Sequence, residues 1–476
     1  MRSRFCLLLL LAALLTGCGR PSSSADGSVV CWPDYDGAVV PCNIAPLNIC
    51  VDGARRGSTV TVAVTAAEGS LSARVRFGRV RFPERRWHRL LAAAKGDTLR
   101  VGIGGDELFS FFVSPDSIDA YLTYRLIAPS YEVWDDVAIV ERCLENFGER
   151  ILSDGAHTDN ACMNCHTHAF GRGDLSFFHL RGAGGGTLVS RDGRLQRFTL
   201  QADSMPVAAT YGDWHPSGRY AVFSWNCVVP ALRAQGSRRM EVYDTASDLL
   251  VADFDTGALR TAPLVSGTDA FETFPTFSPD GRWIYFCRAP FTALPDSVEQ
   301  LRYSLVRIAF DAATGCLGDT LETVWDAAAQ GGSASFPKLS PDGRRLLFCR
   351  SDFGTFPIWH RETTLQMLDL ATGYVDSLPQ LAGDASSSYH SWSSDGRWIA
   401  FASKRGDGQY GRVYFAHVAA DGTVSTPFLL PQRDAQHDRL FLKSYNIPDL
   451  GSSPVPFSVR DVQRLRRDAM PPASRR

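Results

Sequence analysis

Short runs in which apolar residues alternate with polar ones dominate the first quarter of the chain. The clearest of these runs are Thr59–Val64, Ala73–Phe77, Thr98–Val101 and Leu108–Phe112. Stretches containing Gly, Asp and Pro separate them, and a period of two places alternate side chains on one face of a sheet. We therefore expect residues 31–134 to form a small β-sandwich of the immunoglobulin-like type, with one helical turn at Trp87–Leu91.

The spacing of apolar residues changes after the predicted sandwich. Between Asp135 and Leu152 they lie three and four positions apart, at Val140, Cys143, Leu144, Phe147 and Ile151. This spacing is typical of one face of an α-helix, and two aspartates suit the first turn of such a helix. We expect this helix to open residues 135–185, a short segment between two β domains.

A repeated hairpin occupies the second half of the chain. Four copies agree at most positions: Tyr211–Ser224, Phe274–Cys287, Phe336–Cys349 and Tyr389–Ala402. Each copy reads as a strand, a turn of the Pro-Asp-Gly type and a second strand. The turn glycines Gly218, Gly281, Gly343 and Gly396 are 63, 62 and 53 residues apart. A period of this length, with short strands in every unit, predicts a β-propeller over residues 186–450.

Four blades follow directly from the four copies, and the length of the chain suggests more. A fifth is expected, closed by strands at Gly186–Val189 and near Leu440, and a sixth is the alternative. The arginine-rich residues 451–476 are expected to form a short exposed helix and a frayed tail. Taken together, these patterns predict an all-β protein: a sandwich, a short helical segment and a propeller of five or six blades.

The N-terminus has the composition of an export signal. Two arginines precede an apolar run from Phe5 to Leu15, and Leu-Thr-Gly and then Cys18 follow. The run is too short to cross a bilayer as a helix, and small residues stand before the cleavage point. Leu-Thr-Gly-Cys resembles the bacterial lipobox, which implies removal of residues 1–17 and a lipid on Cys18; an ordinary signal peptide is the alternative. Residues 18–30 then form a tether, and we expect a lipid-anchored envelope protein on the periplasmic side of the outer membrane.

Charge and cysteine content narrow the picture further. The formal net charge is −2 and the sequence pI is about 6.6, which gives no electrostatic reason to expect a nucleic acid partner. An oxidising envelope permits disulfides, and one pair among Cys31, Cys42 and Cys50 is plausible. Cys287 and Cys349 occupy the same place in two repeats, so we expect both to be buried as small apolar residues.

The strongest chemical pattern is Cys162-Met163-Asn164-Cys165-His166. In a Cys-x-x-Cys-His sequence the two thiols can bond covalently to haem, and the histidine can serve as the proximal iron ligand. One covalent haem c held by Cys162, Cys165 and His166 is therefore predicted. Zinc is the alternative, with the two cysteines joined by two further ligands from His157, His168, His179 or Cys143. A thioredoxin-like pair is disfavoured because no βαβ unit surrounds the motif.

A sixth iron ligand must approach from the side opposite His166. We favour His179, which lies far enough along the chain to fold back, and therefore predict iron ligation by His166 and His179. His157, Met205 and His215 are the reserves, and an open site is a further alternative. His390 stands in a repeat position and is expected to be structural.

Several segments resemble known families. The Ser-Pro-Asp-Gly-Arg repeats resemble the WD40-like propeller repeat of the TolB type. Beyond the propeller, a further resemblance is carried by Ile44–Asn48, Tyr124–Trp134, the Cys162–His166 motif and His179–Thr187. Together these look like a family of Bacteroidetes envelope lipoproteins described as TolB-like. That resemblance supports the architecture and implies protein partners, but it implies no established activity.

Two functional classes follow from these patterns. The first is an electron carrier in which a single haem with two protein ligands serves a protein partner docked on the propeller. The second is a TolB-like interaction scaffold in which haem is structural or sensory. No Gly-x-Ser-x-Gly elbow or Gly-rich phosphate loop is present, so we expect a carrier or scaffold with no obvious small-molecule substrate. Peroxidase chemistry would need an open iron site and distal acid–base residues, which the sequence does not show.

Overall fold

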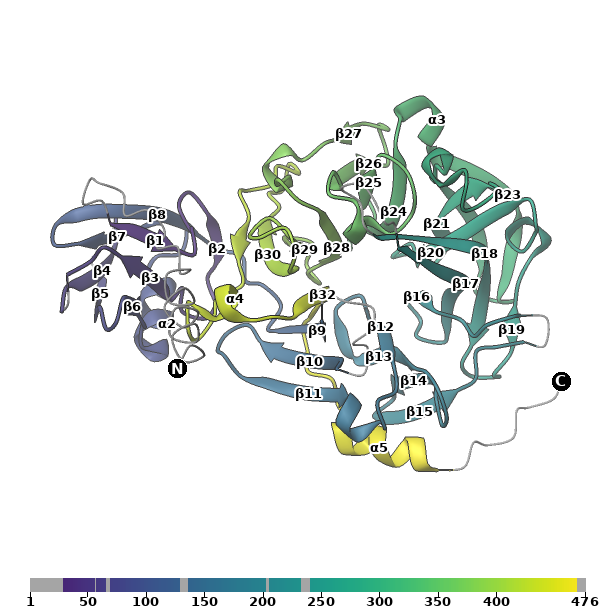
Figure 1. Ribbon diagram of the computed structural model, residues 1–476, viewed down its shortest axis with the longest axis horizontal. Helices are drawn as coiled ribbons and strands as arrows, with labels where there is room; N and C mark the ends of the chain where they lie inside the picture. Colours follow the sequence, from purple (N-terminus) through teal and green to yellow (C-terminus); the bar gives the residue numbers. More distant parts are fainter. Residues whose placement is uncertain are drawn as a thin grey trace, which may run out of the picture.

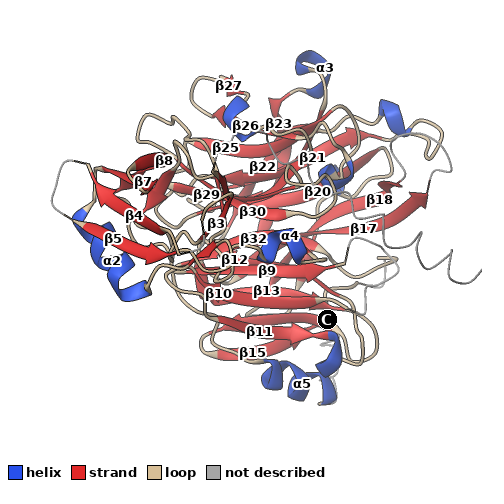
Figure 2. Cartoon of the chain, turned by 60° about the vertical axis from the view of Figure 1, so that its left-hand side comes forward, coloured by secondary structure: helices blue, strands red, loops and turns tan. Residues whose placement is uncertain are grey.

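A computed structural model describes residues 29–55, 57–65, 69–128, 136–202, 205–232 and 240–468. These residues form a smaller N-terminal β region and a larger propeller (Figure 1). Strands make up most of both regions, with a few short helices at the periphery (Figure 2). None of the helices among the described residues is long and apolar enough to cross a membrane. The predicted signal, the predicted lipidation site Cys18 and most of the predicted tether lie outside the described residues.

The N-terminal region contains two sheets. The first has the order β2 (Val39–Pro41), β8 (Asp106–Ser114), β7 (Thr98–Ile103), β4 (Thr59–Val64) and β5 (Ser70–Arg74). The second has the order β1 (Val30–Trp32), β3 (Ile49–Asp52) and β6 (Arg79–Val80). β2 runs parallel to β8, and every other pairing in the two sheets is antiparallel. Two small sheets are therefore present as expected, whereas their immunoglobulin-like type stays a prediction.

A helix covers one side of this region. α2 (Glu84–Ala93) includes the helical turn expected at Trp87–Leu91 and extends it in both directions. Its acidic first residue faces the positive end of the helix dipole, and Trp87 and Leu91 are fully buried. The indole Nε1 of Trp87 donates to the Ile44 carbonyl at 3.0 Å, which fixes the helix to the loop before β3.

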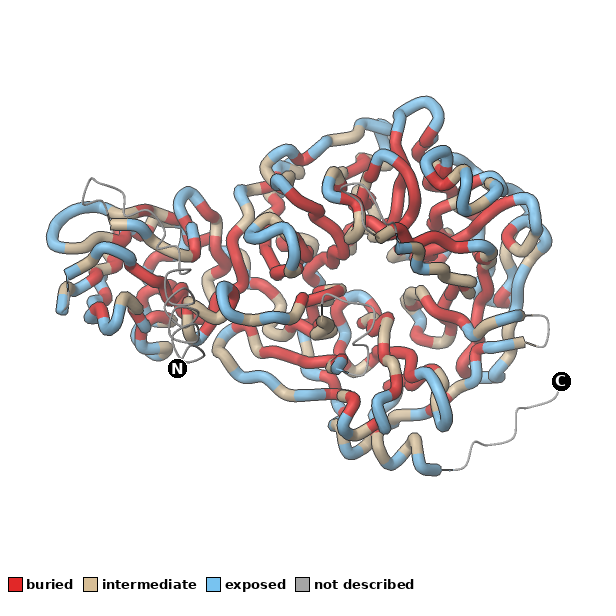
Figure 3. Tube along the Cα trace, viewed as in Figure 1, coloured by how far each residue is buried: buried red, intermediate tan, exposed pale blue. Residues whose placement is uncertain are grey.

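The propeller has six four-stranded blades. Blade I contains β32 (Ser444–Gly451), β9 (Tyr121–Ile127), β10 (Ala138–Cys143) and β11 (Glu149–Asp154), and blade II contains β12 (Met163–Ala169), β13 (Arg172–Leu180), β14 (Gly186–Arg191) and β15 (Arg194–Phe198). Blade III contains β16 (Tyr211–Trp214), β17 (Tyr220–Leu232), β18 (Met240–Asp253) and β19 (Leu259–Arg260), and blade IV contains β20 (Ala270–Phe277), β21 (Trp283–Pro290), β22 (Ser304–Asp311) and β23 (Cys316–Trp325). Blade V contains β24 (Ser333–Leu339), β25 (Arg345–Ser351), β26 (Thr364–Asp369) and β27 (Val375–Asp376), and blade VI contains β28 (Ser387–Trp392), β29 (Trp398–Ser403), β30 (Arg412–His417) and β31 (Phe428–Leu429). In this order each blade runs from its innermost strand outward, and the innermost strands surround the centre of the propeller (Figures 1 and 3).

Strands from the two ends of the propeller sequence close the ring. β32, the last strand of the chain, pairs antiparallel with β9, the first strand of the propeller. The closure leaves no open edge between the first and last blades, and exposed sheet edges are liable to pair with other chains. The propeller therefore begins at Tyr121 rather than at residue 186, and the boundary expected at 134 is wrong because β9 already belongs to blade I. The two strands expected to form a fifth blade belong to different blades. Gly186–Val189 lies in β14 of blade II, and Leu440 lies just before β32 of blade I.

The helix expected between Asp135 and Leu152 is also wrong. Its residues from 138 onward form β10 and β11, a hairpin of blade I. β10 is packed between neighbouring blades, so it is buried on both faces and does not alternate. Its polar residues are buried as ion pairs: Glu141 contacts Arg150 at 2.6 Å, and the buried Arg142 contacts Glu149 at 3.3 Å. Burying polar side chains in this way removed the period-two signal and left an accidental spacing of three and four.

Shorter elements complete the fold. The remaining helices among the described residues are α3 (Ala327–Gln330), α4 (His437–Leu440), α5 (Val459–Arg467) and the 3₁₀ turns η2 (Gly155–His157), η3 (Pro263–Val265), η4 (Val298–Gln300), η5 (Pro357–Trp359) and η6 (Pro379–Leu381). α5 is the helix expected in the basic tail, and it begins with a capping box between Ser458 and Asp461. Its Val462 is fully buried, so the helix is docked on the propeller. Cys31, Cys42 and Cys50 are free thiols, and Cys287 and Cys349 are fully buried as predicted.

Candidate functional site

The Cys162–His166 motif lies on the innermost strand of blade II. In the pairing of β12 with β13, Asn164 stands opposite His179 and Thr167 stands opposite Phe177. One residue too many lies between these pairs on β12, so the strand has a β-bulge at Cys165 and His166. Cys165 has a φ of 54°. The motif is therefore part of a sheet and not the helical segment that the sequence predicted.

The same bulge recurs around the propeller. Phe274, Phe336, Tyr389 and Ile447 occupy the corresponding place on the innermost strands of blades IV, V, VI and I, with φ values from 43° to 54°. Cys165 is thus the blade II member of a repeated position that other blades fill with a large apolar residue. The sequence comparison missed blade I because its two innermost strands, β32 and β9, are far apart in the sequence and form no hairpin. It missed blade II because Ala169 and Phe170 stand before the turn glycine, where the four copies have Pro, Ser or Asp.

His166 has an equivalent in blade VI. Nε2 of His166 lies 3.2 Å from the Thr123 carbonyl of blade I, and Nε2 of His390 lies 3.0 Å from the Leu347 carbonyl of blade V. Each histidine follows the bulge residue and bonds to the second strand of the preceding blade. Burial lowers the pKa of both imidazoles to about 3, so both are neutral and use Nε2–H as a donor. The expectation that His390 is structural is supported, and His166 makes the same inter-blade contact.

The arrangement around the motif does not fit a covalent haem c. A haem would require Nε2 of His166 as the proximal ligand and both thiols along one edge of the ring. Nε2 already donates to Thr123, and the Cys165 thiol is buried, with its pKa raised by burial to about 11. Cys162, which precedes β12, is only partly buried.

His179 is not placed to complete the haem site either. It lies on β13, where Nδ1 contacts the Thr187 hydroxyl at 2.9 Å and the ring packs against Phe223 of blade III. His166 contacts blade I, so the two imidazoles lie on opposite sides of the blade II sheet. Two ligands of one iron cannot be separated by a β-sheet. Haem c and its ligation by His166 and His179 therefore stay predictions, and these residues as folded do not support them.

The zinc alternative gains no support from the described residues. Within the described ranges, no group of three or more His, Cys, Asp or Glu side chains is placed to hold a metal ion. The reserve ligands are dispersed: His157 contacts Asp154 at 2.6 Å, and His215 contacts Ser217 at 2.8 Å.

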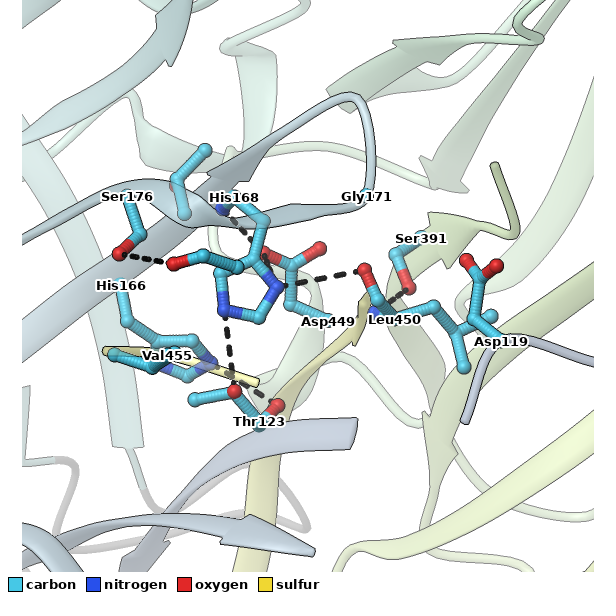
Figure 4. A network of polar contacts seen from close by, with 12 residues as sticks. Asp119, Thr123, His166, His168, Gly171, Ser176, Ser391, Asp449, Leu450 and Val455 are labelled. Carbon is cyan, nitrogen blue, oxygen red and sulfur yellow. Dashed lines mark hydrogen bonds and ion pairs between the residues drawn. The ribbon is translucent and has the colours of Figure 1, made fainter. Parts of the chain in front are cut away.

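A polar network links the motif strand to the closing strand of the propeller (Figure 4). The backbone N–H of His168 donates to Oδ2 of Asp449 at 2.7 Å. The His168 ring is buried between blades, with Nε2 3.2 Å from the Thr123 hydroxyl and Nδ1 3.4 Å from the Leu450 carbonyl. The Leu450 N–H donates to Ser391 Oγ at 3.1 Å, which extends the network to blade VI.

Asp449 belongs to a ring of polar side chains around the propeller axis. We define the axial ring as one residue from the innermost strand of each blade: Thr167, Asp213, Thr276, Lys338, Ser391 and Asp449. Each lies two positions after the bulge residue of its blade or, in blade III, after Tyr211. Nζ of Lys338 in blade V lies 3.0 Å from Oδ2 of Asp213 in blade III, and the Thr276 hydroxyl between them also donates to Asp213. Side chains from three blades meet at this point, which places the ring at the centre.

The charges of the axial ring do not balance. The ring contains two carboxylates and one ammonium group, and the ammonium of Lys338 forms an ion pair with Asp213. Among the described residues, the ion pair found for Asp449 is with His168, at 3.6 Å from Nδ1. Burial raises the pKa of Asp449, although His168 and Lys338 oppose the shift. The side chains of Asp449 and Lys338 remain 17% and 31% exposed, so the ring is not sealed from solvent.

Aromatic side chains lie next to the axial ring. We define the aromatic cluster as Tyr211, Phe274, Phe336, Phe356 and Tyr389. Phe274 and Phe336 stack with their centroids 3.8 Å apart, and Tyr211 and Tyr389 meet this pair edge-on. Sequence reasoning missed both the ring and the cluster, although the repeat alignment already places their members two residues apart.

Comparisons with known proteins find distant similarity. No family model matches the chain. A 162-residue stretch is 27% identical to the uncharacterized protein Atu1656 of Agrobacterium fabrum, covering 34% of this chain and 48% of the relative. The match thus spans about half the length of that relative.

Solved structures that resemble the chain are distant. A hypothetical selenium-binding protein from Sulfolobus tokodaii matches with a TM-score of 0.44 and 10% identity, over 85% of this chain and 96% of its own. A puromycin hydrolase matches with a TM-score of 0.37 and 13% identity, over 65% and 45%. An oligogalacturonate lyase in complex with manganese matches with a TM-score of 0.36 and 12% identity, over 66% and 75%. No functional argument rests on these similarities.

Proposed function

We propose that the protein is a lipid-anchored envelope protein that binds a small organic cation at the axial ring of its propeller. The observation that carries this proposal is the carboxylate of Asp449, which lies at the axis with no lysine or arginine at ion-pair distance among the described residues, since Lys338 is paired with Asp213. The lipobox-like sequence at Cys18 supports the anchor.

The chemistry next to Asp449 favours an organic ammonium group as ligand. A cation at the axis would compensate the second carboxylate of the ring and oppose the effect of burial on its pKa. Four members of the aromatic cluster, on the innermost strands of blades III to VI, lie two residues before ring members: Tyr211, Phe274, Phe336 and Tyr389. Aromatic faces attract ammonium groups most when the site is partly desolvated. A carboxylate beside aromatic rings is a combination that recognises alkylated amines.

Choline and its neutral isostere 3,3-dimethylbutan-1-ol provide a matched test. We expect choline to bind saturably in calorimetry and the isostere to bind at least about tenfold more weakly, because only choline can interact with a carboxylate and with aromatic faces through its charge. Asp449→Asn should weaken choline binding by a similar factor. Lys338→Met should strengthen it, because the competing ammonium is removed. Asp421→Asn, in an exposed turn of blade VI, is the control and should change nothing.

Two results would overturn the binding proposal. Equal affinity for choline and the isostere would show that charge plays no part in binding. If neither probe bound, the axial ring would not be a site for organic ammonium groups. The electron-transfer hypothesis is tested separately, by absorption spectra of the chain expressed with haem-attachment machinery. A haem spectrum that disappears in His166→Ala would revive that hypothesis.

A further inference from the structure

Four exposed apolar side chains gather where the N-terminal region meets the propeller. Phe77 is 90% exposed, Leu440 70%, Leu442 67% and Val30 53%. Large apolar side chains with this exposure are normal singly, but a group of them marks an interaction surface. We call these four residues the junction patch.

Strand pairing and ion pairs bring the segments that carry the patch close together. Val30 pairs directly with Asp52, and Arg439, the neighbour of Leu440, reaches the Asp52 carboxylate at 3.5 Å. On the other side of β3, the Val51 N–H donates to the carbonyl of Gly78, next to Phe77, at 2.7 Å. Adjacent strands lie about 4.8 Å apart, so Phe77 and Val30 are separated by only two strand spacings. α4 lies beside the N-terminal region in Figure 1.

Basic side chains surround the junction patch. Arg76, Arg79, Arg81, Arg439 and Lys443 lie at or beside it, and the acidic partners found for them are Asp52, Asp136 and Asp434. The basic residues therefore outnumber the acidic ones. An apolar patch with a basic rim is the combination that binds an anionic lipid surface.

The place where the described chain begins points to the same occupant. β1 starts at Val30, inside the patch, and only residues 19–28 and Val29 separate it from Cys18. An extended chain of that length spans at most about 35–40 Å. A lipid on Cys18 would therefore hold the bilayer within reach of this surface.

We propose that the junction patch lies against the membrane and sets the orientation of the protein on it. This inference rests on the lipid anchor included in the proposed function. Leu440, Leu442 and Phe77 contact the acyl boundary, and the surrounding arginines contact lipid phosphates. The axial ring is thereby held in a defined direction relative to the membrane instead of turning freely on the tether.

Hydrogen exchange on the lipidated full chain tests the orientation. The protein is reconstituted in vesicles of phosphatidylethanolamine and phosphatidylglycerol and compared with the same chain in detergent. Exchange at residues 437–443 and at the 76–79 turn is expected to slow about tenfold in vesicles, the factor that corresponds to burial of one leucine side chain. Leu440→Asp together with Leu442→Asp should abolish the protection at both segments, including the Phe77 turn, which is far from the two leucines in the sequence. Leu232→Asp, at another exposed apolar position, is the matched control and should leave it unchanged.

The possible failures are distinguishable. A chain that is not lipidated and stays in the supernatant contradicts the anchor in the proposed function. A chain that is anchored but shows no protection at either segment overturns the inference and leaves the anchor intact. Protection that appears without vesicles and rises with protein concentration would assign the patch to a second copy of the chain and would also overturn it.

Discussion

Blades II and VI contain the same histidine in the same place, but only in blade II do cysteines stand beside it in the sequence. His166 and His390 each follow a bulge residue in the left-handed region, and each donates to a carbonyl of the preceding blade. In blade VI the histidine makes this contact although no haem-like sequence is near it. The comparison shows that the geometry of His166 needs no cofactor to explain it. It also shows how a repeat position can imitate a cofactor motif.

The largest expected difference between equivalent positions concerns the bulge residue itself. Phe274→Ala should lower the free energy of unfolding by about 3–5 kcal/mol, because it empties a buried aromatic position in a stacked pair. Cys165→Ala should cost about 1 kcal/mol, since it removes one sulfur atom from a buried site. Urea titrations of the two variants check the ratio. A larger loss in Cys165→Ala than in Phe274→Ala would mean that the thiol holds something that blade IV does not.

A smaller effect should be shared by the two histidines. His166→Ala and His390→Ala should each cost about 1–3 kcal/mol, because each leaves a buried carbonyl without its donor. The same urea titration measures both, and His→Gln variants, which keep an N–H donor, should recover part of the loss. If His166→Ala were far more costly than His390→Ala, the two positions would not be equivalent and blade II would have a role of its own.

The two histidines should also make the protein sensitive to acid. Burial lowers the pKa of His166 and His390 from the ordinary 6.5 to about 3. Between these two pH values the histidines are protonated in the unfolded chain but not in the folded chain. Their contribution to stability is complete above pH 6.5 and is lost progressively as the pH falls towards 3. The urea midpoint should fall in this window, and the double His→Gln variant should flatten the fall.

The last prediction concerns two buried carboxyl groups of blades III and IV, whose contribution to stability depends on pH in the opposite direction. Burial raises the pKa of Asp244 in blade III and of Glu272 in blade IV to about 7. These folded-state values lie above the ordinary ones, so their contribution is complete below about pH 4 and is lost as the pH rises through 7. Asp244→Asn should reduce the loss of stability between about pH 4 and 7 and leave the contribution of His166 and His390 unchanged. If the double His→Gln substitution had a different effect in this variant than in the wild-type chain, the two contributions would not be independent.

Local sequence patterns predicted the repeated part of the fold well. The four copies of the Pro-Asp-Gly hairpin form the first two strands of blades III to VI, and their turn glycines have φ values of 70° or 71°. Blade I was missed because Glu141 and Arg142 are buried in β10 and because its strands come from both ends of the propeller sequence. Blade II was missed because its turn has Ala169 and Phe170 where the four copies have Pro, Ser or Asp. The haem site was predicted from five adjacent residues, whereas the sheet directs their side chains towards different neighbours.

By itself, the sequence determined the strands whose residues alternate or repeat, the turns that need glycine, and the burial of Cys287 and Cys349. These features depend on each residue and its near neighbours along the chain. The tertiary structure alone decided that β32 pairs with β9, that His166 and His179 lie on opposite sides of one sheet, and that Lys338, Asp213 and Asp449 meet at the axis. Closing the ring joins residues more than three hundred positions apart, and no local pattern of hydrophobic and polar residues encodes which strand will lie beside which.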